Sequence, residues 1–84
     1  MSEHAVYIVR CQDDTYYTGY AVDVMQRIAT HNAGKGAKYT RARLPVVLVH
    51  QEAFATKSEA MKREYAIKQL TRSQKERLIQ GGSS

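Results

Sequence analysis

The pattern of apolar and polar positions predicts two adjoining strands at the start of the chain. Residues 4–11 are rich in Val, Ile and Tyr, and residues 15–20 consist mainly of Tyr and Thr. Both compositions favour β-structure. The polar residues 12–14 between them are a turn signal, so we expect a hairpin. A third strand is expected at residues 46–51, after Pro45, and its uninterrupted apolar run predicts burial on both faces.

Capping residues predict three helices. Asp23 is a suitable N-cap for a helix over residues 24–32, which the loop Gly34-Lys35-Gly36 would end. Two capping boxes, each a Ser or Thr followed three residues later by Glu, predict helices to about residues 70 and 79: Thr56-x-x-Glu59 and Ser73-x-x-Glu76. The order ββαβαα predicts an α+β fold, with a three-stranded, mainly antiparallel sheet flanked by helices.

The length of the hairpin loop decides which side chains share a face. A three-residue loop pairs Val9 with Tyr17 and Tyr7 with Gly19. Tyr7 and Tyr17 would then be diagonal neighbours on one face, and Gly19 would leave open space beside the Tyr7 phenol. A two-residue turn would shift the pairing by one residue and place the two tyrosines on opposite faces.

Composition narrows the class of protein. The chain has 84 residues, enough for one domain over residues 1–84, with a core at about 4–80 and a flexible tail at 81–84. Lys and Arg number 13 against 8 Asp and Glu, a net charge of +5. This surplus favours a polyanionic partner such as nucleic acid, although a merely soluble basic protein would have it too.

The sequence also excludes several classes of protein. The single cysteine excludes an internal disulfide, and no Cys/His cluster has the spacing of a zinc site. The first residues lack the pattern of a signal peptide, and no apolar run has the length of a membrane span. We therefore expect a cytoplasmic protein without a membrane partner.

Three residues on the predicted helices are candidates for chemistry. Arg27 and His31 are four residues apart, so they share one face at the edge of the apolar side of the first helix. An ordinary solvated Arg and a surface His would show the same spacing. Glu64 falls between Ala60 and Ile67, inside the apolar side of the second long helix, where an unpaired carboxylate is costly. Glu64 therefore either binds a metal ion or pairs with a cation such as Arg27.

The loop over residues 35–43 combines cations with an aromatic ring. Cations can contact phosphates and an aromatic side chain can stack on a base, so this loop is a candidate nucleic-acid-binding site. A solvated charged surface would look the same in sequence. The candidate contact residues are Lys35, Lys38, Tyr39, Arg41 and Arg43.

The ordered set of these residues resembles the GIY-YIG endonuclease superfamily, specifically its small single-domain bacterial YhbQ-like (UPF0213) group. Ala5-Val6-Tyr7 stands at the first tripeptide and Tyr17-Thr18-Gly19 at the second, followed by Arg27, His31 and Glu64. The resemblance covers about residues 4–80. Ala5, Val6 and Thr18 depart from the tripeptides, but both phenols remain. A late Asn found near the site in some relatives has no counterpart, since the only Asn is Asn32.

The resemblance implies a divalent-metal-dependent endonuclease acting on DNA phosphodiester bonds. Glu64 would be the sole protein ligand of one Mg²⁺ or Mn²⁺ ion, and Arg27 would stabilise charge on the phosphate. Tyr7, or a water that it orients, would deprotonate the attacking water, with Tyr17 and His31 completing the proton path. Nearby cations are expected to lower the pKa of the Tyr7 phenol.

The resemblance also bears on the substrate. Relatives often carry a separate recognition domain, and none is present in this sequence. We therefore expect weak sequence specificity, selection of DNA by its structure, which includes branched and single-stranded forms, a link to DNA repair or processing, and specificity supplied by a partner protein. The alternatives are a non-catalytic nucleic-acid-binding module and an interaction protein in which these residues are purely structural.

Overall fold

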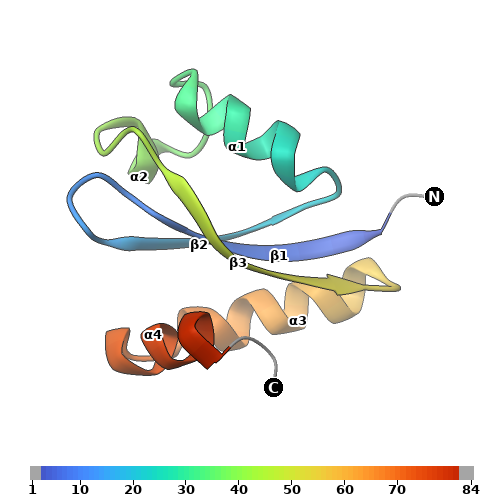
Figure 1. Cartoon of the computed structure of the whole chain (residues 1–84). Helices are drawn as coiled ribbons and strands as arrows, with labels where there is room; N and C mark the ends of the chain where they lie inside the picture. The colour runs from blue at the N-terminus through green and yellow to red at the C-terminus, as the bar shows by residue number, and fades with distance from the viewer. Residues whose placement is uncertain (1–2, 82–84) are drawn as a thin grey trace.

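The computed structural model describes residues 3–81 and shows one sheet between two layers of helices (Figure 1). The antiparallel sheet has the strand order β2-β1-β3 and consists of β1 (His4–Arg10), β2 (Tyr16–Ala21) and β3 (Val47–Phe54). One face is covered by α1 (Val24–Asn32) and the short α2 (Lys38–Arg41), and the other by α3 (Lys57–Lys68) and α4 (Arg72–Gly81). The predicted α+β class and the order ββαβαα are confirmed, with α2 as an unpredicted addition inside the basic loop.

The hairpin has the three-residue loop on which the shared face of the two tyrosines depends. The Cys11 amide donates to the Thr15 carbonyl at 2.8 Å, and Asp14 adopts a positive φ of 69°. This geometry is a common solution for a loop of this length. Tyr7 therefore pairs with Gly19, and Tyr17 lies on the same face of the sheet as Tyr7.

The alternating side chains of β1 build a separate core on each side of the sheet. Tyr7 and Val9 face α1, where they pack with residues such as Val24. Val6 and Ile8 belong to the other core, with Ala60 and Ile67 of α3. The site residues of β1 and the predicted carboxylate of α3 thus start from opposite layers. Within the described residues 3–81, no helix is both long and apolar enough to cross a membrane.

The prediction that the third strand is buried on both faces is wrong. β3 is an edge strand that pairs only with β1, and Val47 at its start is 51% exposed. The apolar run instead contributes Val46, which is buried just before the strand. The Asn32 side chain holds this position from the end of α1, since it accepts from the Val46 amide at 2.8 Å and donates to the Val46 carbonyl at 3.2 Å.

One of the two predicted capping boxes is displaced. Thr56 caps α3 as expected, since its hydroxyl accepts from the Glu59 amide at 3.1 Å. Helix α4 begins earlier than predicted: Thr71 Oγ1 accepts from the Gln74 amide at 3.2 Å, and Gln74 Oε1 accepts from the Thr71 amide at 2.9 Å. Ser73 lies inside the first turn, so the prediction that it caps this helix is wrong.

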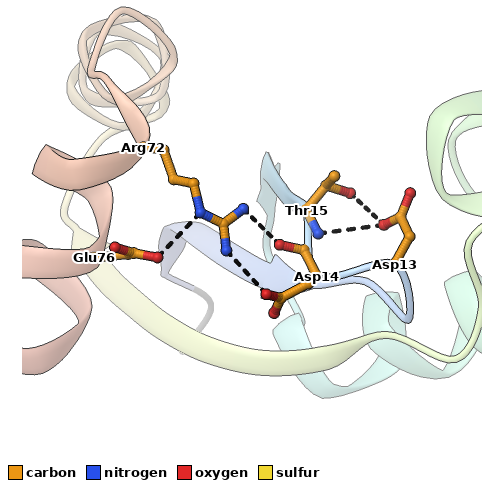
Figure 2. Close-up of polar contacts among 5 residues, drawn as sticks. All are labelled: Asp13, Asp14, Thr15, Arg72 and Glu76. Carbon is orange, nitrogen blue, oxygen red and sulfur yellow. Dashed lines mark hydrogen bonds and ion pairs between the residues drawn. The ribbon is translucent and has the colours of Figure 1, made fainter.

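Helix α4 is also tied to the hairpin loop by one arginine (Figure 2). Arg72 donates to the Asp14 carbonyl at 2.6 Å and to the Asp14 carboxylate at 3.3 Å. It also bonds Glu76 on its own helix, and its guanidinium lies 4.8 Å from the centre of the Tyr16 ring. These contacts connect the start of α4 to the hairpin loop and the start of β2.

The displaced cap is testable by a pair of substitutions. Loss of a capping hydroxyl typically costs about 0.5–2 kcal/mol, so we expect T71A to lower the free energy of unfolding by about this amount. S73A should change it by a few tenths of a kcal/mol at most. Urea denaturation followed by circular dichroism measures both variants, and a larger loss for S73A would contradict this assignment.

Candidate active site

The Tyr7 phenol is buried in the sheet and lies directly over Gly19. Tyr7 is 2% exposed. A Cβ atom placed on Gly19 would lie 2.5 Å from the Tyr7 hydroxyl oxygen and 2.7 Å from Cζ, closer than real Cβ contacts allow. The space that we expected to be open beside the phenol is therefore filled by the phenol itself. Gly19 is required because its missing side chain lets the phenol cross β2.

The Tyr7 hydroxyl is hydrogen-bonded to a buried histidine. Tyr7 Oη and His31 Nε2 are 2.8 Å apart, and His31 Nδ1 lies 2.9 Å from Thr40 Oγ1. The Thr40 hydroxyl donates its single proton to the Ala37 carbonyl at 2.9 Å, so it accepts from Nδ1–H. The Ala37 amide N–H also points at Nδ1, but at 3.4 Å this contact is the longer and weaker of the two, so the Thr40 contact decides the tautomer. This assignment leaves Nε2 unprotonated, and Tyr7 donates to it.

The environment of His31 keeps the imidazole neutral. Burial lowers its pKa below the ordinary value, and the positive charge of Arg27 lowers it further. The ring also lies against Gly36, where a Cβ atom would collide with it. Sequence reasoning missed Thr40 and this role of Gly36, because neither a lone Thr nor a loop Gly signals contact with a particular side chain.

Tyr17 and Tyr39 extend the site toward the surface. The Tyr17 ring is edge-on to His31 at 5.6 Å between centroids and stacks with Tyr39 at 5.9 Å. Arg43 lies 4.0 Å above the centre of the Tyr39 ring, donates to the Tyr39 carbonyl at 2.7 Å and pairs with Asp13 at 3.0 Å. Arg43 thus already holds Tyr39 in place, although it was predicted as a phosphate contact.

The remaining predicted contacts of the basic loop are exposed. Lys35, Lys38 and Arg41 have no ion-pair partner among residues 3–81, and Lys38 and Arg41 belong to the short α2. Their side chains are available to a ligand. The prediction that they contact nucleic acid stays a prediction.

Arg27 faces a hollow at the outer edge of β2. Within the described part of the chain its exposed guanidinium has no hydrogen-bond or ion-pair partner, and its charge acts to lower the pKa of both Tyr7 and His31. We call this hollow, of about 450 Å³, the arginine hollow. It is lined by Tyr20, Ala21, Val22, Asp23, Gln26, Arg27 and Thr30.

Glu64 acts electrostatically on Tyr7 even though α3 covers the other face of the sheet. Helix α3 packs against both β1 and β2, and the Glu64 side chain is only 14% exposed. Its negative charge is one of the causes that raise the pKa of Tyr7. The alternative that Glu64 pairs with a cation is confirmed, but its partner is Lys68 at 3.1 Å and not Arg27.

The pKa of Tyr7 itself contradicts our expectation. Burial first, then the neighbouring Tyr17 and Glu64, raise the pKa of Tyr7 to about 12, and Arg27 opposes them. Arg27 acts in the expected direction, but burial outweighs it in the protein alone. The further lowering of the pKa that was expected from a bound metal ion stays a prediction. At neutral pH Tyr7 is protonated and donates to His31.

A metal ion would find one protein ligand here. Residues 3–81 contain no group of three or more His, Cys, Asp or Glu side chains that could hold an ion. Mg²⁺ is commonly bound by one or two carboxylates together with water and substrate phosphate. Glu64 fits an ion of that kind if Lys68 releases it, so the residues are suited to an ion that arrives with a phosphate.

Titration of Tyr7 tests whether the charges of Arg27 and Glu64 both act on its phenol. We expect E64Q to lower the pKa of Tyr7 and R27Q to raise it, since the first removes a repelling negative charge and the second an attracting positive one. Each variant is titrated by ultraviolet absorbance with and without the added substitution Y7F. The difference between the two titration curves is the signal of Tyr7. E59Q is the matched control, because Glu59 is exposed in the first turn of α3. A Tyr7 pKa that E64Q leaves unchanged would contradict the placement of Glu64.

The crossing of Tyr7 over Gly19 gives a second test. We expect G19A to lower the free energy of unfolding by about 1–3 kcal/mol, because the added methyl group overpacks a filled space. G81A is the control, since a Cβ atom there would meet nothing within 4 Å. Chemical denaturation measures both variants, and equal stability of G19A and the wild type would rule out this packing.

Comparison with known proteins shows the family of this chain. The GIY-YIG catalytic domain family matches residues 3–77. A UPF0213 protein of Staphylococcus haemolyticus is 62% identical over 95% of this chain and 98% of its own, and one of Halobacterium salinarum is 65% identical over 90% and 99%. The names of these relatives state no activity.

Solved structures give the same result. The solution NMR structure of a UPF0213 protein from Bacillus halodurans is 50% identical, with a TM-score of 0.63 over 98% of this chain and 87% of that one. A solution NMR structure from E. faecalis is 46% identical, with a TM-score of 0.63 over 94% and 84%. The chain therefore belongs to the GIY-YIG family, a nuclease-type superfamily, and is similar to its UPF0213 members.

Proposed function

We propose that this protein is a divalent-metal-dependent endonuclease that hydrolyses DNA phosphodiester bonds with weak sequence preference. The observation that carries the proposal is the hydrogen bond from the buried Tyr7 hydroxyl to a neutral His31, with the charges of Arg27 and Glu64 both acting on that phenol. The GIY-YIG domain supports a nucleic-acid substrate, and the net charge of +5 agrees with a polyanion.

Tyr7 and His31 supply a route for the proton of the attacking water. A phenol with a pKa of about 12 is not ionised at neutral pH, so it cannot act as a free phenolate base. It can accept the water proton while passing its own to His31 Nε2. His31 then becomes an imidazolium whose Nδ1–H stays bonded to Thr40. The proton of the water thus replaces that of Tyr7, and the proton that Tyr7 gave up is held at His31.

Arg27 would stabilise the phosphate during attack. Its guanidinium faces the arginine hollow and has no competing carboxylate partner among residues 3–81. A guanidinium can donate two hydrogen bonds to phosphate oxygens and is most effective where negative charge develops. The exposure of Arg27 supports a substrate contact over a structural role.

Glu64 would hold one Mg²⁺ or Mn²⁺ ion, which when bound would neutralise charge on the phosphate and on its leaving oxygen. Lys68 would have to release the carboxylate. The exposed cations Lys35, Lys38 and Arg41 would contact the DNA backbone. Such contacts do not read bases, so the sequence preference would be weak. Selection by DNA structure, a role in repair and a partner protein that adds specificity are parts of the same proposal.

Nicking of supercoiled plasmid tests the proposal. We expect the wild type to nick in the presence of Mg²⁺ or Mn²⁺ and E64Q to have no detectable activity, because the carboxylate ligand is lost. Y7F should lower the rate by about 10²–10⁴-fold, the usual contribution of a general acid–base group. E59Q is the control: it replaces an exposed glutamate of the same helix and should retain wild-type activity.

Binding of plasmid without any nicking under either metal ion would contradict the proposal. That result would favour a non-catalytic nucleic-acid-binding module. Equal activity of E64Q and E59Q would contradict the role of Glu64.

A further inference from the structure

A second hollow opens on the same edge of β2, near the hairpin loop. We call it the lysine hollow. It has a volume of about 240 Å³ and is lined by Tyr16, Tyr17, Thr18, Tyr39, Lys68 and Lys75. These residues come from β2, α2, α3 and α4, so the hollow lies where both helical layers meet the sheet edge.

The two hollows share one strand and flank Tyr7. Tyr16 to Thr18 line the lysine hollow, and Tyr20 and Ala21 line the arginine hollow. Gly19 lies between them in sequence, and the Tyr7 hydroxyl lies over it. The free edge of β2 therefore carries a recess on each side of the Tyr7 hydroxyl.

The lining of the lysine hollow combines cations with stacked rings. The Lys75 side chain has no ion-pair partner within residues 3–81, whereas Lys68 is shared with Glu64. Tyr17 and Tyr39 are stacked on each other, and Tyr39 is 38% exposed. Cations for a phosphate beside an aromatic ring for a base are the usual elements of single-strand recognition.

Thr18 gives an independent indication of a ligand. Thr18 is 3% exposed, and its Oγ1 is the buried side-chain polar atom of residues 3–81 that lacks any hydrogen-bond partner. A buried hydroxyl without a partner is costly, and a valine at this position would fill the same volume without that cost.

We propose that the lysine hollow binds one unpaired nucleotide of a DNA strand, next to the phosphate that Arg27 would contact. Tyr39 stacks on its base, Lys75 contacts its phosphate and the Thr18 hydroxyl hydrogen-bonds the bound nucleotide. The hollow has the size for one base rather than for a duplex, so the bound strand is single at this point. The proposal rests on the proposed function for the position of the adjoining phosphate.

Binding without metal ions tests this proposal separately from cleavage. The probe is a fluorescein-labelled oligothymidylate, and its fluorescence anisotropy is measured in EDTA over a series of salt concentrations. T18V removes the hydroxyl but keeps the side-chain shape. K75Q removes one charge from the hollow. K62Q is the matched control, since Lys62 is an exposed lysine of α3 that does not line the hollow.

We expect T18V to weaken binding about tenfold, the effect of one lost hydrogen bond, while its melting temperature stays equal to or above that of the wild type. K75Q should reduce the slope of log K against log salt by about 0.7, as for one lost phosphate contact on a single strand. K62Q should leave the affinity and the slope close to those of the wild type.

Several results would overturn the proposal: T18V binding as tightly as the wild type, K75Q and K62Q weakening binding equally, or no binding by the wild type. The proposed function fails differently. A wild type that shows the T18V and K75Q effects but never nicks plasmid would remove catalysis and keep the nucleotide site. A wild type that nicks while T18V and K75Q bind normally would keep catalysis and remove the site.

Discussion

The hydrogen bond between the Tyr7 hydroxyl and His31 Nε2 is the interaction on which the rest of the site depends. It joins the central strand to α1 inside the core, at a place where both groups are almost completely buried. A buried phenol and a buried imidazole each need a partner, and here each supplies the partner of the other. Gly19 and Gly36 provide the space for the two rings, and the Thr40 hydroxyl fixes the imidazole through its Nδ1 atom.

The edge of β2 explains how residues from opposite layers act on one phenol. Tyr7, Tyr17 and Arg27 belong to the layer of α1, whereas Glu64 comes from α3 on the other side of the sheet. Because β2 is an edge strand and Gly19 has no side chain, the phenol crosses the strand toward its open side. There the positive and negative charges of Arg27 and Glu64 oppose each other, and burial decides that the phenol stays protonated.

Local sequence signals predicted the parts of the fold that local interactions control. The three-residue hairpin loop gave the correct pairing of Tyr7 with Gly19, and Asp23 and Thr56 cap the helices as expected. Thr71 was missed because two overlapping capping boxes are possible there, and only the packing of α4 on the hairpin selects one.

Contacts that depend on how the helices and strands pack could not be predicted from the sequence. The Lys68 partner of Glu64 lies one turn away, yet choosing it over Arg27 requires knowing that α3 and α1 lie on opposite faces. Thr40 reaches His31 only through the short α2, which has no capping hydrogen bond from a side chain and no apolar periodicity to reveal it. Likewise, β3 is exposed because the strand order puts it at the edge of the sheet. Its apolar run does not indicate that position.

The tautomer and charge of His31 test the central claim most directly. The account requires a neutral imidazole with the proton on Nδ1 and an unprotonated Nε2 that accepts from Tyr7. Nitrogen NMR of the labelled protein at neutral pH should show this tautomer, with a His31 pKa below the ordinary value because of burial and Arg27. A proton on Nε2, or a charged His31 at neutral pH, would contradict the proton route from Tyr7.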